Sequence, residues 1–346
     1  MQEKFDNLNS PLANKITARS DEYLYFGGTA YLGIPQNEKF LKLYLKGLKL
    51  FGLNNGTSRS NNVQLGIYSE VEQYAASKFG AEAALITSSG YLAAQLTVKN
   101  LSHFGEIRYA PATHPALWYL DIPQVPSSFG AWAKNIVDEI NNSEKENWVI
   151  ISNSMNNLFP EIYDFSFLKK INKKILLIVD DSHGIGINNN GLGVFKTLPK
   201  SDNLEILVIA SMAKALGVDA GIVLGKIERI AELKKSNEFL GASPPSAAGL
   251  YAFMQAEEIY TNELEKLNQR MQSVNQALLK NEDWQFINEF PVYLSKNAEL
   301  SQKLAAKNIL ISSFAYPDKD GPIINRIVLS SWHSKTDIAY LIKALI

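Results

Sequence analysis

Short apolar runs alternate with stretches of helical periodicity along most of the chain. In the helical stretches, apolar residues recur every three to four positions, whereas each run is continuous and bounded by polar or glycine-rich segments, as in strands buried on both faces. Helices are expected at Asn37–Leu53, at Tyr68–Phe79 and from about Tyr91 onward. Strands are expected at Ala83–Thr87, Trp148–Ser152, Lys174–Asp180, Leu204–Ala210 and Gly221–Leu224. Strands separated by helices predict a parallel sheet with helices on both faces.

The pattern changes after the Pro244-Pro245 pair. A long helix is expected from Ala247, with apolar positions at helical spacing that continue to Leu264. The remaining chain mixes strand-like segments with a closing helix, namely Phe290–Leu294, Asn325–Leu329 and Thr336–Leu345. We therefore expect a large domain over residues 41–250 and a small C-terminal α+β domain over residues 251–346. The N-terminal segment, residues 1–40, is expected to pack with the small domain.

Composition excludes several classes of function. The net charge of −1, with acids and bases interspersed, gives no basic groove for nucleic acid and no polybasic patch for a membrane. The sequence contains no cysteine, which excludes disulfides, zinc–thiolate sites and thiol catalysis, and no metal site is expected. No apolar run is long enough to span a bilayer, and the N-terminus lacks the features of a signal peptide. We expect a soluble cytoplasmic protein.

A pair of polar residues follows the buried run that ends at Val179. Asp180 comes directly after this run, and His183 follows three residues later. Ligands of open α/β sheets bind at the carboxyl ends of strands, so Asp180 should lie at such an end. A desolvated carboxylate there needs a cationic or hydrogen-bonding partner, which a protonated pyridine nitrogen would supply. His183 would then reach the phenolate oxygen of the same ring. Alternatively, Asp180 caps a turn and His183 is a structural histidine.

Lys214 follows the next apolar run, in which Glu205 is the one charged residue. Most lysines are solvated surface groups, which this setting does not favour. Desolvation lowers the pKa of a lysine, as a Schiff-base amine requires. A lysine that holds the aldehyde and an aspartate that keeps the ring nitrogen protonated are groups that pyridoxal phosphate requires. Lys214 and Asp180 together therefore predict a pyridoxal-phosphate enzyme, with Ser211 in reach of the phosphate.

Three further segments have both a functional and a structural interpretation. Ser88-Ser89-Gly90-Tyr91 lies between a strand and a helix, where free N–H groups bind anions; the alternative is a plain capping turn. His114, in a loop, either stacks on the cofactor ring or is an exposed polar residue. Arg326, on a short strand of the small domain, either clamps a substrate carboxylate or forms a surface ion pair.

Together these segments resemble the α-oxoamine synthases, a family of fold-type I pyridoxal-phosphate enzymes. The resemblance runs from Tyr23 to the C-terminus and keeps the order and spacing of the family's motifs. The segments similar to those motifs are Tyr31-Leu32-Gly33, Gly56-Thr57-Ser58-Arg59, Ser88-Ser89-Gly90-Tyr91, Thr113-His114, Asp180 to Gly186, Asn190 to Val194, Ser211 to Gly217, Ser243-Pro244-Pro245 and Arg326 to His333. Their combination is specific for the family and much less so for any one member.

The resemblance implies an α/β fold of the aspartate aminotransferase-like pyridoxal-phosphate transferase type, with a mainly parallel sheet in the large domain and a smaller α+β C-terminal domain. It implies condensation of an α-amino acid with an acyl-CoA, with Lys214, His114 and Asp180 as catalytic residues. It also implies that Arg326 and Asn153 bind substrate, and that the protein is a homodimer with shared active sites. The implied cofactor-binding residues are Ser89, Gly90, Tyr91, His114, Asp180, His183, Ser211 and Lys214.

Several positions depart from the family's pattern. Asn153 replaces a glutamate, Asp181 replaces the glutamate of the Asp-Glu-Ala-His motif, and residues 156–161 replace the usual Ser-Met-Asp-Gly. These departures concern the acyl-CoA side of the site and the identity of the amino acid. Two alternatives stay open: another fold-type I reaction, such as transamination or aldol cleavage, and a homologue with altered catalysis.

Overall fold

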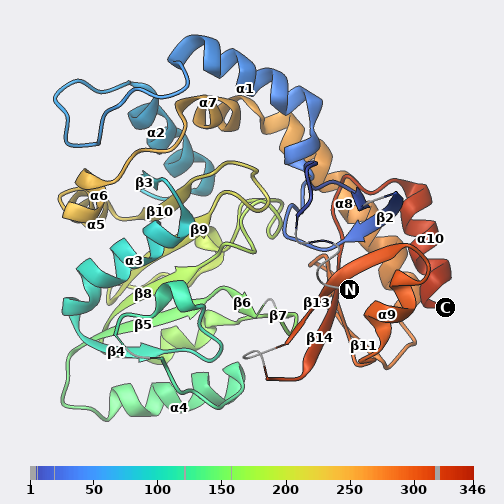
Figure 1. Cartoon of the computed structure of the whole chain (residues 1–346). Coiled ribbons are helices and arrows are strands. Elements are labelled where there is room, and N and C mark those ends of the chain that lie inside the picture. The colour runs from blue at the N-terminus through green and yellow to red at the C-terminus, as the bar shows by residue number, and fades with distance from the viewer. Residues whose placement is uncertain (1–4, 6, 19, 121, 157, 316–319) are drawn as a thin grey trace. The chain divides into compact units, whose positions relative to one another are not determined.

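The structure, a computed structural model of the chain, describes residues 5, 7–18, 20–120, 122–156, 158–315 and 320–346. Its internal contacts divide the chain into two compact units (Figure 1). The first comprises Met1–Lys39, Asn157–Glu161 and Glu258–Ile346, and the second comprises Phe40–Asn156 and Ile162–Glu257. The expected domains, with boundaries at residues 40 and 250, stay a prediction because compactness does not test whether each part folds alone.

The second unit is built on a six-stranded sheet with the strand order β3-β10-β9-β8-β5-β4. Figure 1 shows these strands in succession from β3 near the top to β4 near the bottom. Their bounds are β3 (Ala83–Thr87), β4 (Glu106–Tyr109), β5 (Asn147–Asn153), β8 (Lys174–Asp180), β9 (Leu204–Ser211) and β10 (Gly221–Gly225). Because β4, β5, β8 and β9 pair in parallel, the polar residues that follow them lie along one edge of the sheet.

β10 departs from the parallel pattern, since it pairs antiparallel with both β9 and β3. The segment 212–220 that joins β9 to β10 is too short for the crossover connection that a parallel pair needs. It closes instead through a hydrogen bond from the N–H of Met212 to the carbonyl of Ala220 (2.9 Å), with Gly217 at φ 64°. The expectation of parallel pairing is therefore wrong for this strand, and Lys214 lies in a hairpin loop.

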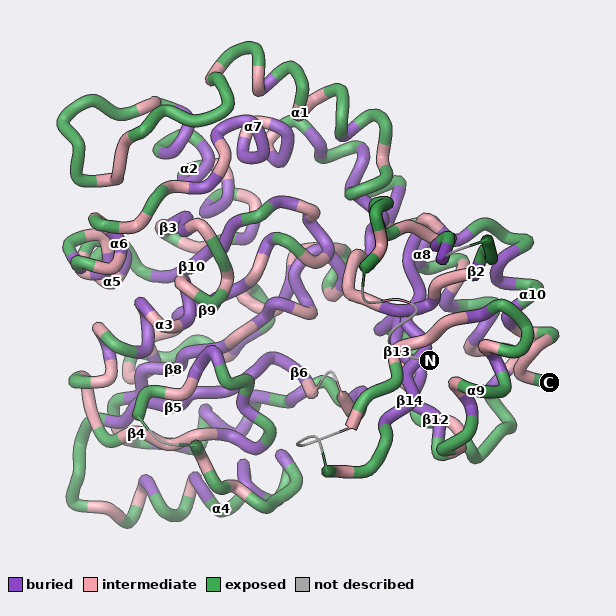
Figure 2. Tube along the Cα trace, in the orientation of Figure 1, coloured by how far each residue is buried: buried purple, intermediate pink, exposed green. Residues whose placement is uncertain are grey.

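The helices of the second unit surround this sheet. They are most of α1 (Glu38–Phe51), α2 (Ile67–Phe79), α3 (Gly90–Leu101), α4 (Phe129–Asn141), α5 (Ile227–Leu233), α6 (Asn237–Gly241) and α7 (Ala247–Gln255), with short 3-10 turns η3 (Ser102–Phe104), η4 (Pro115–Leu117), η5 (Phe165–Lys170) and η6 (Phe195–Thr197). Alternate strand residues such as Leu176, Ile178 and Leu207 form one buried cluster with residues of α3. Figure 2 shows the buried strands and, in contrast, the largely exposed α1 and the loop after it.

The first unit contains a second six-stranded sheet, with the order β1-β2-β13-β14-β12-β11. Its strands are β1 (Lys15–Ala18), β2 (Asp21–Phe26), β11 (Trp284–Gln285), β12 (Val292–Ser295), β13 (Ile309–Ala315) and β14 (Ile323–Val328). β2 pairs in parallel with β13, so the N-terminal segment joins the C-terminal sheet. The helices of this unit are η2 (Ile34–Gln36), nearly all of α8 (Glu257–Leu278), α9 (Leu300–Ala305) and α10 (Lys335–Leu345). The chain also contains a small two-stranded sheet of β6 (Met155–Asn156) and β7 (Glu161–Ile162).

The long helix expected from Ala247 is in fact two helices. α7 ends at Gln255, Ala256 adopts φ −100° and ψ 17°, and α8 begins at Glu257. Alanine is the strongest helix former, so nothing in the local residue types marks this break. Within the described residues, none of the helices combines the length and the apolarity that crossing a membrane requires.

Candidate functional site

The turn after β3 packs directly against the end of β9. Ser89 caps α3 by accepting a hydrogen bond from the N–H of Leu92 (3.1 Å). A Cβ atom on Gly90 would lie 2.7 Å from Cα of Ser211, so only glycine permits this approach. The first N–H groups of a helix have no intrahelical acceptor, which makes this end of α3, beside Ser211, a candidate site for an anion. The side chain of Tyr91, in contrast, is 63% exposed.

The end of β8 is tied to the end of β9 by Ser182. The N–H of Ser211 donates to Oγ of Ser182 (2.8 Å). The N–H of Ser182 in turn donates to Oδ1 of Asp180 (2.8 Å), which fixes the half-buried Asp180 carboxylate at the carboxyl edge of the sheet. The structure thus brings Asp180 and Ser211 to adjacent strand ends, as their sequence positions predict.

Lys214 and His183 meet at this edge. Nζ of Lys214 lies 3.0 Å from Nε2 of His183, within hydrogen-bond distance. The lysine comes from the hairpin loop after β9 and the histidine from the segment after β8. Both side chains are half-buried. The amine of Lys214 is therefore held toward the strand end that carries Asp180 rather than toward bulk solvent.

His114 belongs to the same neighbourhood although its residue surface is exposed. Desolvation by the surrounding protein lowers the pKa of His114, while the nearby Asp180 carboxylate raises that pKa and the Lys214 ammonium lowers it. The two charges act on the imidazole because the three side chains lie close together. His114 therefore stays a candidate for stacking on a planar ligand at this edge.

Asn153 ends β5, where it is the register partner of Asp180 on β8. Its side chain, in a residue that is 8% exposed, contacts the main chain of Ala112 and His114. The position was expected to bind substrate because the resemblance places a glutamate there. The contacts found in the structure are with the protein's own backbone.

Asp181 is a buried acid to which sequence reasoning assigned no function. It is 1% exposed, and its Oδ2 accepts the N–H of Val194 (2.8 Å). Burial raises the pKa of Asp181 to about 7; contacts with the Ser154 hydroxyl and the Val194 N–H lower it, and the Asp180 charge raises it. A Cβ atom on Gly184 or on Gly193 would lie within 2.2 Å of the carboxylate oxygens. These two glycines are the sequence feature that could have indicated a buried acid at this position, because each lets the 184–194 loop approach Asp181.

Arg326 lies in the first unit, on β14, between Leu294 of β12 and Ser312 of β13. The residue is 5% exposed, and its buried Nε atom meets no hydrogen-bond acceptor among the described residues. Burial lowers the pKa of Arg326, and the neighbouring Tyr31 raises it. Arg326 is buried and forms no ion pair with any described residue, which contradicts the surface ion pair that was the structural alternative. A buried guanidinium whose Nε has no acceptor among those residues is suited to an external anion.

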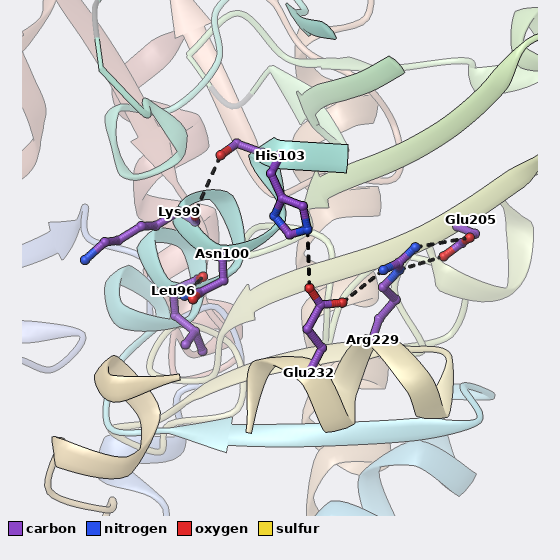
Figure 3. A network of polar contacts seen from close by, with 8 residues as sticks. Leu96, Lys99, Asn100, His103, Glu205, Arg229 and Glu232 are labelled. Atoms are coloured by element: carbon purple, nitrogen blue, oxygen red, sulfur yellow. Dashed lines mark hydrogen bonds and ion pairs between the residues drawn. The ribbon is translucent and has the colours of Figure 1, made fainter. Parts of the chain in front are cut away.

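His103, in contrast, belongs to a polar network on the helical face of the second unit (Figure 3). Its Nε2 lies 3.6 Å from Oε1 of Glu232 on α5, and Glu232 also pairs with Arg229 (2.9 Å). Arg229 bonds Glu205 on β9 as well (2.8 Å). This network joins α5 to the sheet and contains none of the residues named above as cofactor ligands.

The family model for aminotransferase class I and II matches residues 36–345 of the chain. Two similar curated proteins are 8-amino-7-oxononanoate synthases, from Saccharophagus degradans (25% identical; 96% of this chain, 88% of the relative) and from Petrotoga mobilis (24% identical; 90% and 84%). Among solved structures, serine palmitoyltransferase from S. paucimobilis with a bound PLP–myriocin aldimine matches at a TM-score of 0.79 and 15% identity, covering 98% of this chain and 90% of that one. 8-Amino-7-oxononanoate synthase from Francisella tularensis matches at 0.72 and 18%, covering 93% and 96%.

Two expectations are confirmed by these matches. The sequence resemblance extends over nearly the whole chain to relatives of the expected kind. The fold is that of the fold-type I pyridoxal-phosphate transferases, since solved structures of that type superpose on it with high TM-scores. The roles of the individual site residues stay predictions.

Proposed function

The chain belongs to the aminotransferase class I and II family, and on this premise we propose that it is a pyridoxal-phosphate-dependent acyltransferase that condenses an α-amino acid with an acyl-CoA. The observation that carries the proposal is the 3.0 Å contact between Lys214 and His183 at the strand end that also holds Asp180. The names of the similar proteins, an oxononanoate synthase and a palmitoyltransferase, support this reaction class.

The residues at the sheet edge fit pyridoxal phosphate. Gly90 lets the first turn of α3 pack against Ser211, since a Cβ there would lie 2.6 Å from the Ser211 Cβ, and the first N–H groups of α3 suit a phosphate. Asp180 suits the ring nitrogen, His183 the phenolate oxygen, and the exposed His114 a face of the ring. When bound, the cofactor supplies an aldehyde that captures amines and a ring that accepts electron density from Cα of the substrate.

Lys214 is the base of the proposed reaction. Its amine must accept the Cα proton of the amino acid, which requires a neutral Nζ near the operating pH. The contact with His183 orients Nζ. The Asp180 carboxylate, held by the Ser182 N–H, supplies the negative charge that keeps the ring nitrogen protonated. Lys214 thus acts on the Cα proton of the substrate, and Asp180 acts on the ring nitrogen of the cofactor.

Arg326 is proposed to hold the carboxylate of the amino acid. Its guanidinium is buried in the first unit, and its Nε has no acceptor among the described residues. A planar guanidinium binds a carboxylate through two parallel hydrogen bonds, which fixes orientation as well as position. The acyl-CoA partner is proposed from the reaction class alone.

We further propose that the protein is a cytoplasmic homodimer with shared active sites. α1 and the loop after it present leucines that a monomer would leave in water, namely Leu41 (56% exposed), Leu45 (48%), Leu50 (58%) and Leu53 (85%). Large exposed apolar side chains of this kind are consistent with an interaction surface. The segments Gly56–Arg59 and Gly241–Ser243 would complete the neighbouring site. Light scattering after gel filtration should give twice the chain mass of 38.5 kDa; a monomer at micromolar concentration would contradict the dimer.

The central experiment is spectroscopic and chemical. Added pyridoxal phosphate should give the wild type a visible absorption band, which Lys214→Ala abolishes and Lys226→Ala, at an exposed lysine, retains. The wild type should release free thiol from acyl-CoA only when an α-amino acid is present. A protein that binds no cofactor would refute the proposal. Formation of a keto acid without thiol release would favour the alternative reaction of transamination, which the name of the family itself supports.

A further inference from the structure

We propose that Asn153 is a positioning residue: its amide clamps the backbone of residues 112–114 and so sets the plane of the His114 imidazole against the cofactor ring. This inference rests on the proposed function, because it requires pyridoxal phosphate at the sheet edge. It replaces the expectation that Asn153 contacts substrate.

Both ends of the Asn153 amide contact the loop that carries His114. Oδ1 accepts the main-chain N–H of His114 (3.1 Å), and Nδ2 donates to the carbonyl of Ala112 (2.7 Å). An amide offers an acceptor and a donor side by side, whereas an ionised carboxylate only accepts. The pair of contacts therefore requires asparagine, or a protonated acid, at this position.

The backbone that Asn153 holds has an unfavourable conformation at Ala112. Ala112 has φ 53°, in the left-handed region that residues with a side chain enter only at a cost in free energy. The hydrogen bond from Asn153 to the carbonyl of Ala112 offsets part of that cost. Loss of the amide would therefore allow the 112–114 segment to relax, and His114 would move with it.

The imidazole is fixed from its other side as well. The N–H of Ala116 donates to Nδ1 of His114 (3.1 Å). In the neutral imidazole the ring proton is consequently on Nε2. Asn153 thus holds the main chain of His114 while Ala116 holds its ring, and the clamp on the main chain directs the plane of the imidazole.

The strand register explains how this clamp is coupled to the opposite side of the ring. Asn153 and Asp180 are partners on the neighbouring parallel strands β5 and β8, and the N–H of Ser154 donates to the carbonyl of Asp180 (2.8 Å). One pair of strand ends therefore carries both the clamp for His114 and the acid for the ring nitrogen. An ionised carboxylate at position 153 would face Asp180 and compete with its role.

The test compares three variants in the full-length protein. Asn153→Ala removes both hydrogen bonds. Asn153→Asp preserves shape but presents an oxygen to the carbonyl of Ala112 unless the acid is protonated. Asn203→Ala is the matched control, because Nδ2 of Asn203 also holds two carbonyls, those of Ile171 (2.9 Å) and Lys173 (2.7 Å), at the opposite end of the sheet. The readouts are the dissociation constant for pyridoxal phosphate, the circular dichroism of the bound cofactor, and thermal unfolding of the cofactor-free protein.

We expect Asn153→Ala to raise the dissociation constant by about tenfold, because the relaxed 112–114 segment would have to be ordered again when the cofactor binds, and to weaken the circular dichroism of the cofactor. Asn203→Ala should destabilise the protein to a similar degree without either effect. The Asn153→Asp variant should bind poorly at about pH 8 and recover, relative to wild type, at about pH 6, because burial and Asp180 favour the protonated acid.

Three results would show whether the inference about Asn153 or the proposed function itself is wrong. If Asn153→Ala keeps the wild-type dissociation constant and circular dichroism, the inference is wrong and the proposed function stands. A constant ratio of Asn153→Asp to wild-type affinity across this pH range also overturns the inference, since a packing role would show no such recovery. A wild type that binds no pyridoxal phosphate overturns the proposed function and the inference with it.

Discussion

The N–H of Val194 donates a 2.8 Å hydrogen bond to Oδ2 of Asp181, a carboxyl that is 1% exposed. Burial raises the pKa of Asp181 to about 7, from its ordinary value of 3.8. The folded protein therefore keeps a proton on Asp181 that the unfolded chain releases, so the contribution of Asp181 to stability falls as pH rises from about 4 to about 7. Asp181→Asn should remove this contribution, measured as the difference from wild type in the urea midpoint of the cofactor-free protein at a series of pH values.

Asp164 provides a control of opposite sign for this experiment. Hydrogen bonds from Ser166 lower the pKa of Asp164, which is exposed, so its contribution is present at neutral pH and lost as pH falls. In Asp164→Asn, the urea midpoint should change between pH 4 and pH 7 in the same direction as in the wild type. A slope that persists in Asp181→Asn would show that another group causes it.

Gly90→Ala should separate the turn after β3 from the end of β9. The new Cβ would lie 2.6 Å from Cβ and 2.7 Å from Cα of Ser211, so one segment must move. Overpacking of this kind destabilises by about 1–3 kcal/mol, and the displaced N–H groups should bind phosphate more weakly. Thermal unfolding and inorganic-phosphate competition against pyridoxal phosphate measure the two effects.

The matched control is Gly130→Ala, also near a helix start, where the new Cβ meets nothing within 4 Å. Alanine there should be neutral or stabilise by up to about 1 kcal/mol. Equal effects of the two substitutions would mean that the approach of Gly90 to Ser211 is not required.

Arg326→Met should weaken substrate binding and stabilise the free protein. The buried guanidinium lacks a partner at Nε among the described residues, so an apolar replacement removes a desolvation cost and should add about 1 kcal/mol or more. The KM for the amino acid should rise by roughly a hundredfold, because its carboxylate loses a bidentate partner. Calorimetry and initial rates measure these opposite changes.

Arg229→Met is the comparison for Arg326→Met, because Arg229 pairs with Glu205 and Glu232 in the network of Figure 3. Its loss should lower stability and leave the KM unchanged. If Arg326→Met also destabilised the protein with no change in KM, Arg326 would be a structural residue.

Asp180→Asn should leave the cofactor bound but reduce proton removal from Cα of the amino acid by about a hundredfold or more, since an amide cannot keep the ring nitrogen protonated. Exchange of the Cα proton in D2O, followed by NMR without acyl-CoA, measures this step alone. Asp219→Asn, at an exposed acid in the loop that carries Lys214, should exchange at the wild-type rate. Equal rates in all three proteins would remove Asp180 from the mechanism.

The sequence predicts the buried strands best. The strands expected at Ala83–Thr87 and Lys174–Asp180 have the same bounds as β3 and β8. Strands buried on both faces require uninterrupted apolar residues, and the polar residue that ends each run also marks the edge where ligands bind. For the same reason Asp180, Ser211 and Lys214 could be assigned to one edge before the structure was known.

Other features escaped this reasoning for different reasons. The direction of β10 could have been predicted from the shortness of the 212–220 connection, whereas the break at Ala256 leaves no mark in the residue types. The partners of Asn153 depend on the left-handed backbone of Ala112, which lies 41 residues earlier in the chain. The hydrogen-bond partners of a side chain can be identified only when the segments that fold against that side chain are known.

The hairpin that carries Lys214 also limits where the chain tolerates insertions. Side chains alternate between the two faces of a strand, so one extra residue between Leu204 and Ser211 would turn over every side chain beyond it and displace the amine. At the opposite end of the same strand, the exposed residues Lys200, Ser201 and Asp202 form a surface connection. A peptide tag or fluorescent label added there would lengthen only that connection and leave the lysine in register.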